Sequence, residues 1–149
     1  MSRIRSLRMT AIVMVVLLAL QFELGMAVNL SPSLEDIPPV AGTPAAIWHA
    51  LVKVGAGAPV HAILGTLLTV VALVSLILSL RTGSTLMAVI GAASFVSVMM
   101  AAVNGILFTM SGFKDDHYSH GMATAFILSF SLFFVQIAIL TLRVRQSRA

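Results

Sequence analysis

Two histidines, His61 and His120, are the side chains best suited to hold a cofactor. Each lies near one end of a long apolar stretch, and the two stretches would place them at the same depth in a membrane. Neutral imidazole nitrogens ligate haem iron, so the pair is a candidate site for haem b. Its propionates could meet Lys53 or Lys114. The alternative is that both are ordinary interfacial or hydrogen-bonded histidines.

A second group of potential ligands lies in a short polar segment and at the start of the last apolar stretch. Mixed histidine, methionine and carboxylate ligands suit a transition metal, copper best of all. The candidates are Asp116, His117, His120 and Met122, with Asp115 and Met110 nearby. Each has a structural alternative, because aspartate also caps helices and methionine commonly fills packing gaps. The spacing favours neither interpretation.

Polar side chains inside apolar stretches form a third set of candidates: Glu23, Asn29 and Asn104. A carboxylate below the membrane surface is costly unless it is protonated, paired or able to reach the headgroups. We interpret Glu23 as an interfacial residue, with a proton, metal or partner contact as the functional alternative. Asn104 is expected to form a hydrogen bond between helices.

The elements that must position these residues follow from composition. Of the 149 residues, 59% are hydrophobic and 9% charged, which is too few polar residues to cover a soluble domain. Four apolar stretches, at 7–30, 59–80, 85–110 and 117–142, are each long enough to cross a bilayer as a helix. The sequence therefore predicts a single-domain, all-α integral membrane four-helix bundle.

The connections between the stretches are short, with one exception. Polar turns at 81–84 and 111–116 join the later spans. The segment 31–58 is longer and begins with several prolines. Within it, residues 45–54 have apolar side chains at helical spacing around Trp48, so we expect a short helix on the membrane surface.

Charge predicts the orientation of the bundle. Seven of the nine basic residues fall on one side if both termini are cytoplasmic, leaving only Lys53 and Lys114 outside. Residues 143–149 are then a cytoplasmic tail, and the protein is a multi-pass protein of the cell (cytoplasmic) membrane. The net charge of +4 fits contact with anionic lipid and indicates no nucleic-acid partner. A rival interpretation makes the first stretch a signal peptide, with 25–27 as its cleavage site.

Small and hydroxyl-bearing residues recur at helical spacing in three of the four stretches. Such residues allow close helix approach, so these faces are expected to meet inside the bundle. They are His61, Gly65, Thr69, Ala72, Ser75 and Ser79; Ser94, Ser97, Ala101, Asn104, Phe108 and Ser111; and His120, Thr124, Ile127, Ser131 and Ala138.

Three classes of function remain open. Because the sequence contains no nucleophile elbow, phosphate loop or zincin helix, we favour a non-enzymatic accessory or assembly subunit with a membrane-protein partner or a second copy of itself. A haem- or metal-binding redox protein is the first alternative. A small carrier or channel is the second alternative, and the polar stripes are the feature that suggests it.

The runs 21–30, 61–65 and 104–122 resemble a family of uncharacterised small bacterial four-helix membrane proteins. A looser resemblance is to haem-binding bundles of the cytochrome b561 and haem A synthase types, which place histidines near helix ends. That resemblance implies haem ligation by His61 and His120 only. The second histidine pair of two-haem bundles is missing, as is the Glu-x-x-x-His pattern of haem A synthase.

Overall fold

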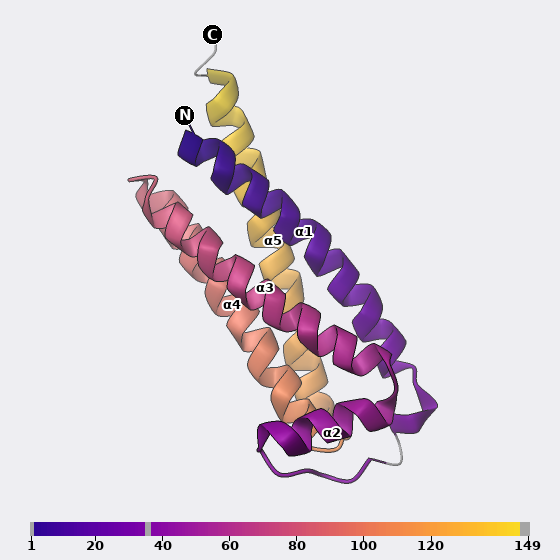
Figure 1. Ribbon diagram of the computed structural model, residues 1–149. Coiled ribbons are helices and arrows are strands. Elements are labelled where there is room, and N and C mark those ends of the chain that lie inside the picture. The colour runs from indigo at the N-terminus through magenta and orange to yellow at the C-terminus, as the bar shows by residue number, and fades with distance from the viewer. Residues whose placement is uncertain (1, 35–36, 147–149) are drawn as a thin grey trace.

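The computed structural model describes residues 2–34 and 37–146, and within these ranges the protein is all-helical (Figure 1). Five α-helices and one 3-10 turn follow each other along the chain. They are α1 (Ser2–Asn29), η1 (Pro32–Leu34), α2 (Pro44–Val54), α3 (Gly57–Leu80), α4 (Thr85–Met110) and α5 (Asp116–Gln146).

Four of these helices, α1, α3, α4 and α5, are long and apolar enough to cross a membrane, as the sequence predicts. Helices α3 and α4 cover the ranges expected for the second and third spans. Helix α1 starts earlier than expected and α5 extends further, to Gln146. Arginine is a good helix former, so the basic ends of the spans continue the helix.

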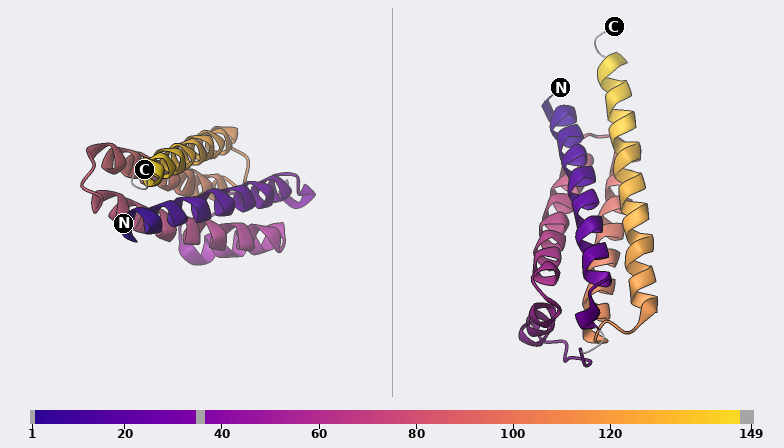
Figure 2. Two further views of the ribbon diagram at one scale, coloured as in Figure 1. Left: turned by 90° about the horizontal axis from the view of Figure 1, so that it is seen from above. Right: turned by 90° about the vertical axis from the view of Figure 1, so that its right-hand side faces the viewer.

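The four long helices form a ring in which each packs on two neighbours. Helix α1 packs on α3 and α5, and α4 packs on the same two helices. Consequently α1 is diagonal to α4, and α3 is diagonal to α5 (Figure 2). The central core includes Ala11, Met14, Leu68 and Phe133. Both termini lie at one end of the bundle and α2 lies across the other (Figure 1).

Helix α2 and the segment before it close one end of the bundle. Thr43 caps α2 by accepting a hydrogen bond from the backbone N–H of Ala46 at 3.3 Å, and proline follows at the first helical position. The backbone N–H of Val40 donates to the carbonyl of Met110 at the end of α4, at 3.0 Å. A separate apolar cluster that includes Ile37 and Val54 lies under α2.

The predicted inner faces are correct for two helices and wrong for the third. On α3 and α4 the residues of the predicted stripes are buried or half-buried. On α5 the predicted stripe faces outward, and Ile127 is 64% exposed. The buried stripe of α5 is instead made of Ala125, Ser129, Phe133, Gln136 and Leu140. Both stripes mix polar and apolar residues, so hydropathy could not choose between them.

Candidate functional site

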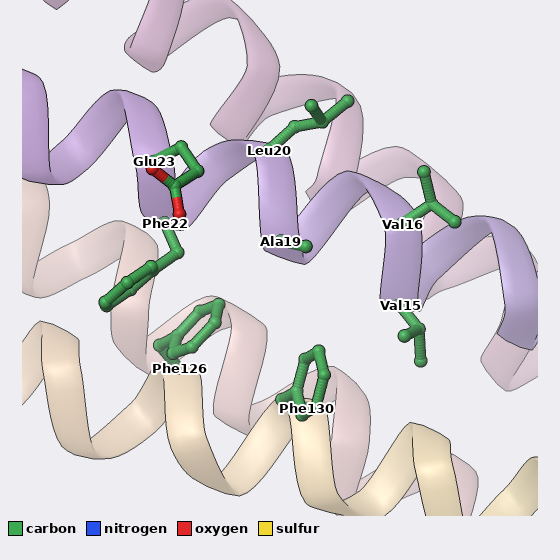
Figure 3. A pocket seen from close by; sticks show the side chains of 8 residues that line it. All are labelled: Val15, Val16, Ala19, Leu20, Phe22, Glu23, Phe126 and Phe130. Carbon is green, nitrogen blue, oxygen red and sulfur yellow. The ribbon is translucent and has the colours of Figure 1, made fainter.

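A groove of about 520 Å³ lies between α1 and α5. Its lining is apolar except for one carboxylate, and Figure 3 shows the aromatic rings from the two helices pointing toward one another. The lining residues are Val15, Val16, Ala19, Leu20, Phe22 and Glu23 of α1, with Phe126 and Phe130 of α5.

The position of the groove reflects where glycine residues allow two helices to approach closely. Gly25 and Gly65 allow close contact between α1 and α3, while Gly105 and Gly121 do the same between α4 and α5. The side chains that meet between α1 and α5 at this level are phenylalanines. Bulky rings hold α1 and α5 apart, whereas Ala19 leaves space between them.

The aromatic rings form a continuous row along the groove. Phe22 of α1 stacks on Phe126 of α5, with ring centroids 5.3 Å apart. Phe126, Phe130 and Phe134 then follow at successive turns of α5, with centroids 5.9 and 6.1 Å apart. These phenylalanines were not among the residues selected from the sequence. Their four-residue spacing along α5 is a signal that could have identified them.

Glu23 is the carboxylate of this groove. It is exposed, and within residues 2–34 and 37–146 it has no hydrogen-bond or ion-pair partner. Glu23 is six positions before Asn29, the last residue of α1, and so lies about 9 Å along the helix from that end. A carboxylate at such a depth is stabilised by a proton, a cation or a hydrogen-bond donor from outside the bundle.

His61 lies between α3 and α1, away from the groove. The side-chain amide of Gln21 is 3.0 Å from its Nε2 and donates to its backbone carbonyl at 3.2 Å. The amide nitrogen is the donor in the bond to the carbonyl, and within residues 2–34 and 37–146 the buried Nδ1 of the ring has no hydrogen-bond partner. The ring packs on Gly25, where an added Cβ would lie 3.0 Å from Cε1. In this setting His61 serves the packing of α1 on α3.

His120 belongs to the outward stripe of α5. Its ring is exposed, and Nδ1 lies 2.8 Å from the carbonyl of Asp116, one turn earlier in the same helix. Because His61 packs against α1 whereas His120 is exposed on the outward stripe of α5, the structure does not bring the two onto one shared face. Haem ligation by this pair stays a prediction, as do the roles of Lys53 and Lys114, which are both exposed.

The predicted metal ligands surround the start of α5. Asp115 accepts a hydrogen bond from the backbone N–H of His117 at 3.0 Å and so caps the helix. Met122 contacts Gly105 of α4. Over residues 2–34 and 37–146, no three histidine, aspartate or glutamate side chains are grouped so that they could hold a metal ion.

The two asparagines differ in their surroundings. Asn104 was expected to bond across helices, but its amide donates to the carbonyl of Met100 in its own helix, at 2.8 Å. Its side chain nevertheless fills the α4–α5 interface, because an added Cβ on Gly121 would lie 2.8 Å from its Cγ. Asn29 is exposed at the end of α1.

Toward the end that holds the termini, one hydrogen bond between two helices is fully buried. Gln136 of α5, which was not selected from the sequence, donates from Nε2 to the Ser79 hydroxyl of α3 at 2.9 Å, and both residues are 0% exposed. This bond links the two diagonal helices through the core. Close by, Gly91 of α4 packs on Ser79. The buried polar side chains of this half thus serve helix packing.

Comparison of the chain with protein families, with curated protein sequences and with solved structures gives no match.

Proposed function

We propose that this protein is a non-enzymatic accessory or assembly subunit that binds a transmembrane helix of another membrane protein in the α1/α5 groove. The observation that carries the proposal is the groove itself, about 520 Å³ of apolar surface open between two membrane-length helices. Side-by-side helix packing in lipid depends on van der Waals fit, which a preformed groove supplies.

The polar side chains support a binding role over a catalytic one. His61, which is shielded by packing, is hydrogen-bonded to Gln21, and Gln136 donates to Ser79. Ser94 and Ser97 each donate to a backbone carbonyl of their own helix. Acid–base or nucleophilic catalysis needs such groups to face a substrate together. Here Glu23 is the titratable side chain that lines the groove.

The proposed setting is the cell membrane, with both termini in the cytoplasm. The positive-inside rule supports this orientation, since Arg3 and Arg143 lie at the end that holds the termini. Both bond to the α3–α4 turn, Arg3 to the carbonyl of Arg81 at 3.4 Å and Arg143 to the hydroxyl of Ser84 at 3.1 Å. Helix α2 would then lie at the outer surface, with the half-exposed ring of Trp48 among the headgroups.

Site-specific photocrosslinking in native membranes tests the proposal. A crosslinking amino acid at Leu20, 52% exposed in the groove, should form an adduct with another membrane protein. The matched control is Val96 of α4, which is 55% exposed outside the groove and should form none. Ala19→Trp fills the groove and should abolish the adduct, whereas Ala92→Trp on α4 should not.

Two results would contradict a binding role. One is a chain that stays monomeric in mild detergent and gives no groove-specific adduct. The other is an adduct from Leu20 that Ala19→Trp leaves unchanged, since a helix seated in the groove must contact both positions.

A further inference from the structure

We propose that the α1/α5 groove selects a transmembrane helix carrying a lysine or arginine at the level of Glu23. This inference rests on the proposed function, because it names the chemistry of the partner that the groove would bind. Its basis is a single carboxylate set among aromatic rings at membrane depth.

The first argument is charge. Glu23 is exposed in an apolar groove, and within the described residues no side chain of the chain neutralises it. An ionised carboxylate in hydrocarbon is strongly destabilised, and a basic side chain there is destabilised as well. When the carboxylate and the basic side chain pair, both free-energy penalties are relieved. The paired state is therefore strongly favoured over a state in which either residue faces lipid.

The second argument is the aromatic row beside the carboxylate. Phe22 and Phe126 stack with centroids 5.3 Å apart, and Phe130 continues the row. Aromatic faces attract cations through their quadrupole, most strongly where water is excluded. A neutral hydrogen-bond donor would satisfy Glu23 but gain nothing from the rings. Carboxylate and rings together therefore favour a cationic side chain.

The third argument identifies the occupant as a helix. The lining residues of α1 run from Val15 to Glu23, a span of about 12 Å along the axis. Two turns of a neighbouring helix make a contact of this length. Glu23 lies about 9 Å along α1 from the end of that helix. A side chain on a membrane-spanning helix can lie at the same depth as Glu23, whereas the ammonium group of a lipid stays at the interface.

A second copy of this chain does not supply the cation. Between Arg8 and Asn29, throughout α3 and α4, and in α5 as far as Leu142, the sequence has no lysine or arginine. A copy in the same orientation therefore presents no lysine or arginine at the depth of Glu23. The partner must be a different protein.

A two-component association assay in a bacterial membrane tests the inference with the full-length chain. The probes are single-span leucine–alanine helices that differ at one position about 9 Å from the outer end, occupied by lysine, glutamate or leucine. The lysine probe should associate with the protein about 5- to 30-fold more strongly than the leucine probe. Glu23→Gln should remove that preference, and Glu23→Lys should transfer it to the glutamate probe.

The outcomes separate this inference from the proposed function. If lysine and leucine probes bind equally and Ala19→Trp blocks both, the groove binds helices but the charge selection is overturned. If the lysine probe is preferred but Ala19→Trp does not weaken it, the groove is not the site and both proposals are overturned. Failure of Glu23→Lys to favour the glutamate probe also overturns the inference. Circular dichroism of each variant shows that the helices are retained.

Discussion

Substitution of Gly91 tests how closely α3 and α4 approach one another. A Cβ added at Gly91 would lie 2.6 Å from both Cβ and Oγ of Ser79, and 3.7 Å from the Cα of Leu76. The first two distances are well inside van der Waals contact. Because one of the clashing atoms is the Cβ of Ser79, rotation of its side chain cannot relieve the overlap, and the helices must move apart.

The expected cost of Gly91→Ala combines three effects. Overpacking of a tight interface costs about 1–3 kcal/mol. Displacement of Ser79 also weakens its hydrogen bond from Gln136, and such bonds in membrane bundles contribute about 0.6 to 1.7 kcal/mol. Replacing glycine by alanine inside a helix returns about 0.5–1 kcal/mol. We therefore expect a net destabilisation of about 1–4 kcal/mol.

Unfolding of the purified protein in mixed micelles with increasing SDS, followed by circular dichroism, measures this change. The control is Gly105→Ala in the same helix, whose added Cβ would meet only the flexible thioether of Met122, at 3.2 Å. That variant should be neutral or nearly so. In a Ser79→Gly background, Gly91→Ala should cost much less than in the parent, because both clashing atoms are absent. A Gly91→Ala variant as stable as the parent would refute the close α3–α4 contact.

Two further substitutions test contacts at the ends of the bundle. Gln136→Leu should destabilise the protein by about 0.6 to 1.7 kcal/mol in the same unfolding assay. A double-mutant cycle with Ser79→Ala should give a coupling energy of the same size. Additive effects would show that the two side chains do not interact. Gly112→Ala should increase proteolysis in residues 37–43, because Gly112 has φ of +70° and an added Cβ would lie 2.6 Å from the Ile37 carbonyl oxygen. Unchanged cleavage would mean that this segment is not held against Gly112.

The sequence by itself determined the four long helices and where each begins and ends to within a few residues. Hydropathy over about 20 residues is a local property, and an apolar segment of that length must satisfy its own backbone hydrogen bonds as a helix. It also identified the inner stripes of α3 and α4, since most small and polar residues on those helices lie on one face.

Only the tertiary structure decided which face of α5 turns inward and what surrounds each candidate residue. Contacts of Gly121 with Asn104 and of Gln136 with Ser79 orient α5, and these partners are on other helices. The groove has the same origin, because Phe22 and Phe126 are separated by more than a hundred residues in the sequence and meet only once α1 and α5 become neighbours. In lipid every apolar face is acceptable, so the order of helices in the ring depends on shape and hydrogen bonds between helices rather than on hydropathy.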